Sequence, residues 1–252
     1  KIRFMNGSYL MLAGAESPNT LRQHTVRFLI RDDISGWEED AGGEGHPIAI
    51  SDKRVDLNYA LGLAKKFDIS TPLILRGCVI TAKYEASSRG RWYMGCVHCE
   101  ARFDLRIEDM QIAENGPPWN VRYDCPACGC EHTHADKRAM NARGIWIHTR
   151  EIDGVKPPRV IATEEEAQRW LTRDLGVYAM RPGFWITGEM NPFLTWEMLA
   201  QKQADAKGDP KAEMVFINLD LGRPYEVEPL PPDWEKLYAR RTTEFSKGEG
   251  AW

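Results

Sequence analysis

The sequence predicts an α/β fold with a cysteine-rich insertion and a helical region after it, and three features support this prediction. Short apolar runs of strand length, Tyr9–Ala13 and Val26–Ile30, are separated by loops and followed by helical patterns, as is typical of a buried parallel sheet. Two Cys-x-x-Cys pairs then interrupt this pattern within residues 83–150. Helix signals dominate the chain after that insertion.

The composition is that of a globular protein. Of the 252 residues, 42% are hydrophobic and 28% are charged, and 33 Lys and Arg stand against 37 Asp and Glu, for a formal net charge of −4. This balance excludes a disordered chain, because disorder requires low hydrophobicity together with high net charge. No apolar run approaches the roughly 18 residues of a membrane helix, so we expect no membrane partner. The small net charge neither indicates nor excludes a nucleic-acid partner.

Local signals place the elements of the first 82 residues. Ser17-Pro18-Asn19 is a turn signal between the first two strands. Ser51 fits the N-cap of a helix with one apolar face. The remaining expected elements are a helix over residues 52–66, a strand over 67–70 that ends at Thr71-Pro72, and a strand-rich segment over 73–81.

Three helices are expected in the last part of the chain. Thr163 and Glu166 form a capping-box pattern, followed by apolar residues at helical spacing up to Gly176. Thr195 fits the start of a second helix, which Gly208 and Pro210 should end. A third helix is expected from Asp233, after a proline-rich stretch over residues 226–232 that has the composition of a linker.

The cysteines predict a zinc ribbon. Cys96 with Cys99 and Cys125 with Cys128 form two Cys-x-x-Cys pairs that are 25 residues apart, a pattern typical of a tetrahedral Zn²⁺ site. Four thiolates leave no open coordination position, so the predicted site is structural. Disulfide pairing and buried spare cysteines are the alternatives. We interpret the neighbouring candidates as bystanders and Cys78 as a small core residue; the bystanders are His98, Cys130, His132 and His134.

The charge of the cysteine-rich segment does not by itself indicate nucleic-acid binding. Residues 83–150 contain ten Lys or Arg and nine Asp or Glu. This segment therefore lacks the excess of positive charge that is typical of a nucleic-acid-binding surface. Arg89 and Arg91 lie close to Trp92 and Tyr93, which is suggestive only. A ribbon that staples a loop or docks a protein fits the sequence equally well.

Asp32 and Asp33 follow the predicted strand over Val26–Ile30 directly. In α/β folds that hydrolyse nucleotides, ligands bind at the carboxyl ends of the strands. There one carboxylate holds Mg²⁺ on the phosphates and a neighbouring group orients the attacking water. Two acids that open a loop are more commonly just solvated, so this pair alone is a weak indication of catalysis.

The order of motifs along the whole chain resembles one family. The motifs that carry the resemblance are Gly14-Ala15-Glu16-Ser17-Pro18, Leu21-Arg22, Val26–Asp40, Gly43–Pro47, Ser70-Thr71-Pro72, the two cysteine pairs, Phe184-Trp185-Ile186, Asn191-Pro192-Phe193, Trp196 and Phe216–Tyr225. This order is similar to that of the large terminase subunit of lambda-like tailed phages, the DNA-packaging gpA family. The resemblance covers nearly the whole chain, and the order is more specific than any single motif.

The resemblance implies an ATP-driven motor joined to a nuclease that cuts concatemeric viral DNA. By position, Asp32 resembles the Walker B aspartate that holds Mg²⁺, Asp33 the catalytic acid, and Ser70-Thr71-Pro72 the motif that couples hydrolysis to DNA movement. The implied cofactors are ATP and Mg²⁺ beside the structural Zn²⁺. The implied partners are viral double-stranded DNA, the small terminase subunit, the portal protein of the prohead and further copies of the same subunit, in the host cytoplasm.

Two departures from the family pattern affect these roles. Asp33 stands where the family has a glutamate one methylene longer, and Arg31 stands where an aliphatic residue normally closes the strand. In addition, the sequence contains no G-x4-G-K-[S/T] phosphate-binding loop. The chain therefore looks like the middle of a terminase, and we expect it to be inactive on its own.

The expected organisation is a partial P-loop-type parallel sheet with the zinc ribbon inserted and a helical linker region behind it. The expected segments are the C-terminal half of an ATPase domain over residues 1–82, the zinc ribbon over 83–150, a helical lid or linker region over 151–225, and a linker toward a missing nuclease domain over 226–252. Two other functions remain open: a stand-alone zinc-ribbon module that docks nucleic acid or protein without ATPase activity, and a helicase-like ATPase with a zinc insertion.

Overall fold

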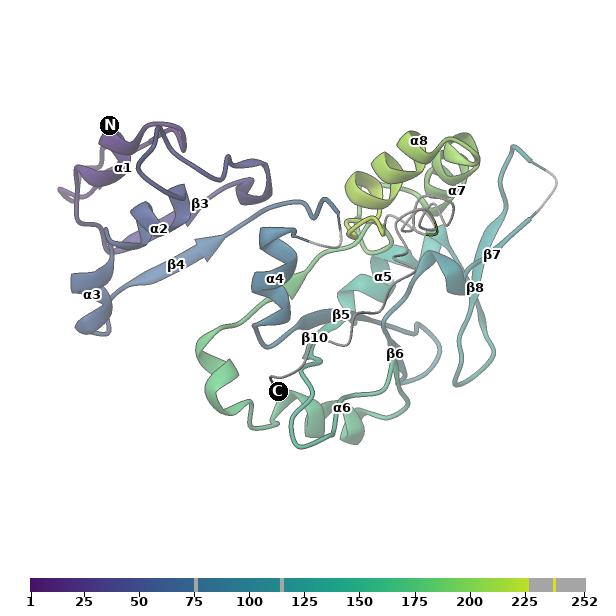
Figure 1. Cartoon of the computed structure of the whole chain (residues 1–252). Coiled ribbons are helices and arrows are strands. Elements are labelled where there is room, and N and C mark those ends of the chain that lie inside the picture. Colours follow the sequence, from purple (N-terminus) through teal and green to yellow (C-terminus); the bar gives the residue numbers. More distant parts are fainter. Residues whose placement is uncertain (75–76, 114–115, 227–237, 239–252) are drawn as a thin grey trace, which may run out of the picture.

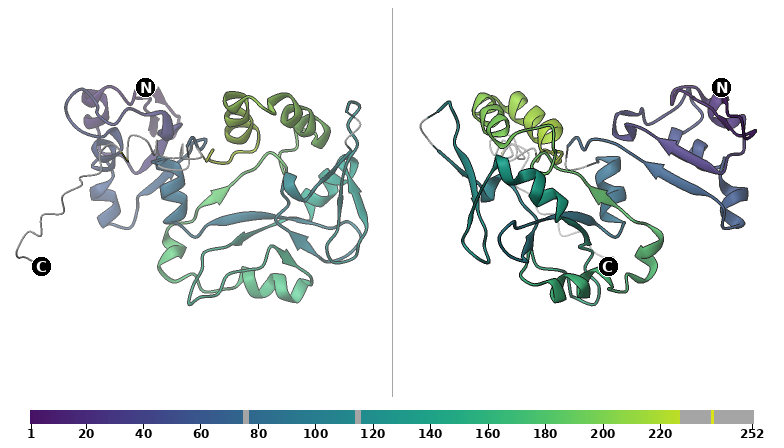
Figure 2. Two further views of the ribbon diagram at one scale, coloured as in Figure 1. Left: turned by 45° about the vertical axis from the view of Figure 1, so that its right-hand side comes forward. Right: turned by 180° about the vertical axis from the view of Figure 1, so that it is seen from behind.

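The computed structural model describes residues 1–74, 77–113, 116–226 and 238. It is a mixed α/β structure with two visibly separate parts: an N-terminal part (residues 1–74) and a larger body (residues 77–226), joined after strand β4 (Figure 1). The views in Figure 2 show the same separation from two other sides. Within the described ranges, no helix combines the length and apolar character needed to cross a membrane.

The N-terminal part contains a short parallel strand pair. Strand β3 lies parallel to β4, with Phe28 opposite Lys65 and Arg31 opposite Asp68. A hairpin of β1 and β2 precedes this pair. The elements are β1 (Ile2–Arg3), β2 (Tyr9–Leu10), α1 (Pro18–Arg22), β3 (Phe28–Arg31), the 3-10 turn η1 (Ile34–Gly36), α2 (Pro47–Asp52), α3 (Asp56–Ala60) and β4 (Lys65–Asp68).

Two expectations for this part are wrong in detail. Of the run over Tyr9–Ala13, only Tyr9 and Leu10 form a strand, and this strand pairs antiparallel with β1 and takes no part in the parallel pair. The helix expected over residues 52–66 is replaced by α2 and α3, because helix α2 begins earlier, at Pro47, where a proline suits the first helical position. The helices are separated at Arg54, whose carbonyl oxygen accepts a hydrogen bond from the Val26 amide at 2.8 Å.

The strand-rich segment expected over residues 73–81 is also wrong. Ile74 forms only an isolated bridge with Tyr225, and helix α4 (Val79–Glu85) starts directly after Cys78. The β-branched residues at the start of this helix favour strands, but packing of α4 against η1 overrides that weak preference.

The body is built around strand β5 (Gly90–Gly95). β10 (Ile145–His148) and β6 (Arg102–Phe103) pair antiparallel with it, β12 (Phe184–Trp185) pairs parallel, and β11 (Val160–Ile161) extends the sheet beyond β6. A second sheet contains β7 (Gln111–Ile112), β8 (Val121–Asp124) and β9 (Glu131–Thr133). The helical elements are η2 (Ile107–Asp109), η3 (His134–Asp136), α5 (Lys137–Ala142), α6 (Glu164–Leu171), η4 (Gly176–Met180), α7 (Trp196–Ala206), α8 (Pro210–Val215) and the π-helical turn η5 (Phe216–Asp220).

Helices cover both sides of the central sheet. Figures 1 and 2 show α6 on one side and α7 with α8 on the other. Successive strand residues point to opposite faces, and accordingly Tyr93 joins a core with Ile147 and Ala167 on the α6 side, whereas Met94 joins the core that contains Trp196 of α7. The body therefore has two apolar cores separated by β5.

The first two helix predictions for the C-terminal region are confirmed. The Thr163 side chain accepts a hydrogen bond from the Glu166 amide at the start of α6, and Thr195 accepts one from the Met198 amide at the start of α7. Pro210 does more than end α7, because it occupies the first turn of α8. The helix expected from Asp233 lies outside the described residues.

Candidate functional site

Asp32 and Asp33 lie at the carboxyl end of β3, and both side chains are exposed. Asp33 has a left-handed backbone conformation with φ of 51°, which is uncommon for a residue other than glycine. Its amide donates a hydrogen bond to Asp32 Oδ1 at 3.1 Å, and the indole nitrogen of Trp37 donates to the Asp32 carbonyl oxygen at 3.0 Å. The two carboxylates are thus presented by a tightly bonded turn that leads into η1.

The parallel pairing of β3 and β4 brings Ser70 to this turn. Ser70 Oγ donates to Asp33 Oδ1 at 3.2 Å and accepts from the Ser35 amide at 3.0 Å. Thr71 is half-buried and Pro72 is buried. The structure therefore brings Asp33 and Ser70, which the sequence assigned to two different motifs, into direct contact.

Arg31 faces away from this exposed turn. Its guanidinium is only 2% exposed and pairs with Asp68 of β4, with Nε to Oδ1 at 2.6 Å and NH2 to Oδ2 at 3.1 Å. It also donates to Asp52 Oδ1 at 3.0 Å and to the Ile48 carbonyl oxygen at 3.1 Å, both on α2. An arginine fits this strand end because two carboxylates neutralise it there.

A second ion pair extends the contacts of Asp68. Lys83 Nζ of α4 lies 2.8 Å from Asp68 Oδ2. Burial raises the pKa of Asp68, but hydrogen bonds from Arg31 and Lys83 outweigh it, so that the pKa lies below its ordinary value. Asp68 therefore stays ionised and links β3, β4 and α4. The sequence analysis missed Asp52 and Asp68; the unusual Arg31 was the signal that acidic partners should be sought.

The four predicted metal ligands come together in the body. Their Sγ atoms all lie within 4.8 Å of one another. Cys96 Sγ is 3.8 Å from Cys128 Sγ, and Cys99 Sγ is 3.9 Å from Cys125 Sγ. A tetrahedron with metal–sulfur bonds of about 2.3 Å has sulfur–sulfur edges of about 3.8 Å, so these spacings fit a tetrahedral ion. All six cysteines are free, which excludes the disulfide alternative for this structure.

The surroundings of the sulfur atoms suit bound thiolates. The His98 amide donates to Cys96 Sγ at 3.3 Å and the Ala101 amide to Cys99 Sγ at 3.4 Å, contacts that orient ligands and stabilise negative sulfur. Burial raises the pKa of Cys125 to about 12, whereas a hydrogen bond from the Cys130 backbone lowers the pKa of Cys128 to about 6. A cation is the group that allows all four thiols to be deprotonated together.

His132 belongs to the surroundings of the metal site. The side chain is fully buried, and its Nε2 lies 3.2 Å from Cys96 Sγ. Burial lowers the pKa of His132, which favours the neutral ring. A neutral ring with hydrogen on Nε2 would donate to the Cys96 sulfur and support it from outside the four ligands. The sequence analysis interpreted His132 as a bystander and missed this contact; its place two residues after Cys130 was the available signal.

None of the other cysteine and histidine candidates belongs to the four-sulfur set, although the Cys130 side chain hydrogen-bonds with Cys128. His98 is exposed and stacks on His132, and His134 lies edge-on to Trp196. Cys78 is buried, as expected, but it does more than fill space: its Sγ accepts from the Leu73 amide at 3.4 Å and lies 3.5 Å from Ser35 Oγ. Cys78 thus packs behind the turn that carries the two acidic residues.

Comparisons with known proteins point to one family. The sequence model described as "Phage terminase large subunit gpA, ATPase domain" matches residues 1–146, and the one described as "Terminase large subunit gpA, endonuclease domain" matches residues 181–249. The endonuclease match thus begins earlier along the chain than the sequence analysis placed that domain.

Two curated relatives are terminase large subunits. That of Enterobacteria phage P21 is 26% identical over 242 residues, which cover 89% of this chain and 34% of the relative. That of Escherichia phage lambda is 25% identical over 252 residues, which cover 95% of this chain and 36% of the relative. The chain therefore spans about a third of the length of these relatives. No solved structure matches significantly.

Proposed function

Since the chain belongs to the gpA family of phage terminase large subunits, we propose that it forms part of a motor that packages viral DNA into proheads by ATP hydrolysis. In the longer protein, the same subunit would cut concatemeric DNA. The observation that carries the motor assignment is the contact between Ser70 Oγ and Asp33 Oδ1, at the carboxyl ends of two parallel strands within the ATPase match.

Under this proposal, Asp32 and Asp33 divide two tasks. Asp32 would hold Mg²⁺ with its exposed carboxylate, and the ion would neutralise negative charge on the phosphates of bound ATP. Asp33 orients the attacking water and accepts its proton. Ser70 holds Oδ1 of Asp33, and a Cβ on Gly36 would stand 3.3 Å from Oδ2, so the glycine leaves space beside that oxygen. Two exposed carboxylates are oxygen ligands of the kind that suits a hydrated magnesium ion.

Ser70, Thr71 and Pro72 are proposed as the coupling motif. Ser70 is the group that senses the state of Asp33, and Pro72 is buried, so that a shift at the acid reaches the segment leading to α4. The sheet that holds these residues is proposed to be part of a P-loop-type parallel sheet. This chain has no phosphate-binding loop motif, and we expect neither ATP hydrolysis nor DNA cleavage from it alone.

We propose Zn²⁺ as the ion held by Cys96, Cys99, Cys125 and Cys128, because four thiolates in a closed tetrahedron suit a structural zinc. The proposed segments are the ATPase part over residues 1–82, the zinc ribbon over 83–150, the helical region over 151–225 and the segment over 226–252. The endonuclease match from residue 181 suggests that part of the helical region belongs to the nuclease side.

The proposed partners follow from the family. They are viral double-stranded DNA, the small terminase subunit, the portal protein of the prohead and further copies of the subunit, which would work together in the host cytoplasm.

The assignment is tested by ATP hydrolysis in the longer terminase subunit that carries this segment. Asp32→Asn should abolish hydrolysis, because the amide cannot supply a negative ligand. Glu39→Gln is the matched control: Glu39 is an exposed acid of the same loop, and its loss should leave the rate unchanged. A rate unaffected by Asp32→Asn would favour the alternative of a zinc-ribbon docking module without ATPase activity.

A further inference from the structure

The segment that matches the endonuclease model shares a core with the cysteine cluster. Trp196, Leu199 and Phe216 lie in the same buried apolar cluster as Cys96 and Cys125. Trp196 and Leu199 are fully buried there. The two family-model matches, which are separate along the chain, therefore share one hydrophobic core in space.

Backbone pairing joins the same two regions. β12 adds to β5 in parallel, with Phe184 opposite Gly90 and Trp185 opposite Arg91. A Cβ on Gly90 would come within 2.6 Å of the Gly183 carbonyl oxygen, so only glycine permits this approach. The strand that ends at Gly95, directly before Cys96, is thus also the strand to which β12 of the endonuclease match pairs.

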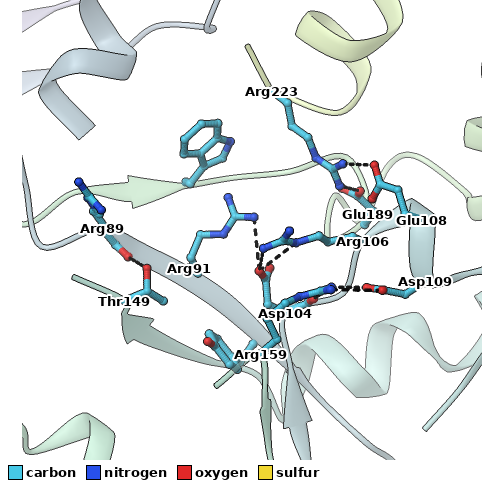
Figure 3. A network of polar contacts seen from close by, with 12 residues as sticks. Arg89, Arg91, Asp104, Arg106, Glu108, Asp109, Thr149, Arg159, Glu189 and Arg223 are labelled. Carbon is cyan, nitrogen blue, oxygen red and sulfur yellow. Dashed lines mark hydrogen bonds and ion pairs between the residues drawn. The ribbon is translucent and has the colours of Figure 1, made fainter. Parts of the chain in front are cut away.

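A buried ion pair also connects the segment that matches the endonuclease model to η2. The Glu189 side chain is fully buried, accepts from the Ile107 amide at 3.0 Å and pairs with Arg223 (Figure 3). Arg223 also lies 2.5 Å from Glu108 Oε1. Burying a carboxylate is costly unless it is paired and hydrogen-bonded. These contacts therefore favour one position of the segment that carries Glu189 and Arg223 relative to η2.

Helix α5 supplies a third set of contacts. Lys137 is buried and its Nζ donates to the Leu194 carbonyl oxygen at 2.6 Å. Asn141 Nδ2 donates to the Met190 carbonyl oxygen at 2.9 Å. Both acceptors lie in the loop before α7, and α5 follows the second cysteine pair after only β9 and η3. The loop is therefore held by a helix that closely follows the second cysteine pair along the chain and packs against β5.

We propose that the metal held by the four cysteines has a second role, which is to hold the start of the endonuclease region on the body. Residues 90–221 then form one folding unit across the boundary between the two family models. Removing the metal should release α7 and α8 together with the strands that carry the cysteines. The inference rests on the proposed metal site and not on ATP hydrolysis.

Hydrogen exchange of the whole chain tests this proposal. The zinc-loaded chain is compared with the chain after chelation, and exchange is followed by mass spectrometry. Amides of α7 should exchange at least tenfold faster after chelation, as should those of β8 and β9. Amides of β3 and β4 serve as the internal control and should not change, because they lie in the N-terminal part.

Two results would overturn the proposal. Faster exchange confined to β5–β9 would mean that the metal is only a local staple, and unchanged exchange throughout would mean that the metal does not support the body. Either result would leave the terminase assignment intact, because ATP takes no part in the experiment.

Two variants with the same change of charge distinguish the packing of α7 on the body from metal binding. Glu189→Gln leaves Arg223 without its buried partner and should accelerate exchange in α7 while the chain still binds one zinc. Glu165→Gln makes the same change at an exposed position of α6 and should have no effect. Equal exchange in both variants would contradict the role assigned to the buried pair.

Discussion

Arg31 provides a quantitative test of how the candidate ATPase turn is built. Arg31→Met removes the guanidinium that neutralises Asp68 and Asp52, whose side chains are 16% and 33% exposed. Loss of one partner from a buried ion pair costs about 3–5 kcal/mol. Water reaches both acids, and Lys83 and Lys66 still pair with them, so we expect the lower end, about 3 kcal/mol. This corresponds to an increase of about 100-fold in the opening equilibrium of β3 and β4.

Native-state hydrogen exchange of the β3 and β4 amides measures that opening directly. Lys66→Met is the matched control, since Lys66 also contacts Asp52 but the two side chains are 36% and 33% exposed. An exposed pair of this kind contributes less than about 1 kcal/mol. If Arg31→Met opened the strands no more than Lys66→Met does, the claim that the buried ion pairs of Arg31 stabilise β3 and β4 would be refuted.

Three further predictions follow from the same geometry. The pKa of folded Asp68 lies below its ordinary value. The ionised carboxylate should therefore contribute its full stabilisation above the ordinary pKa and lose it as the pH falls through the lowered pKa. Hydrogen exchange of the β4 amides between pH 6 and pH 2 measures this loss, and an opening equilibrium that did not change with pH would contradict it. The His132→Ala variant should still bind one zinc per chain, but its affinity for zinc should fall by about 10–100-fold, because the contact with Cys96 is lost. Competition with a chelator measures this affinity, and an unchanged affinity would contradict the role of that contact. In the longer subunit, Asp33→Asn should slow ATP hydrolysis by at least about 100-fold and Asp33→Glu should maintain or raise it; a lower rate for Asp33→Glu would mean that the turn has adapted to the shorter acid.

Elements with local signals were predictable from the sequence. The N-caps of α6 and α7 depend on Thr163 and Thr195 and on residues within one turn of them, and both helices start as predicted. The two cysteine pairs were predictable for the same reason, because two-residue spacing constrains each pair locally. The meeting of these pairs also followed from the pattern, since a tetrahedral ion requires it.

Features that depend on distant residues were not predictable. The segment after Thr71 was expected to be strand-rich, but α4 forms where Cys78 and Lys83 contact η1 and β4. The role of Arg31 required Asp68, which lies 37 residues away and becomes its neighbour only through the parallel register. The shared core of Cys96 and Trp196 likewise joins residues whose proximity has no local signature.

The role of Asp32 in a packaging motor is tested most directly by DNA packaging with the longer subunit. Purified proheads, viral DNA and ATP are combined with the wild-type subunit or with Asp32→Asn, and the DNA that becomes protected from added nuclease is measured. We expect protected DNA with the wild-type subunit and with Glu39→Gln, and none with Asp32→Asn. Equal protection with Asp32→Asn would contradict the assignment of this turn to the packaging motor.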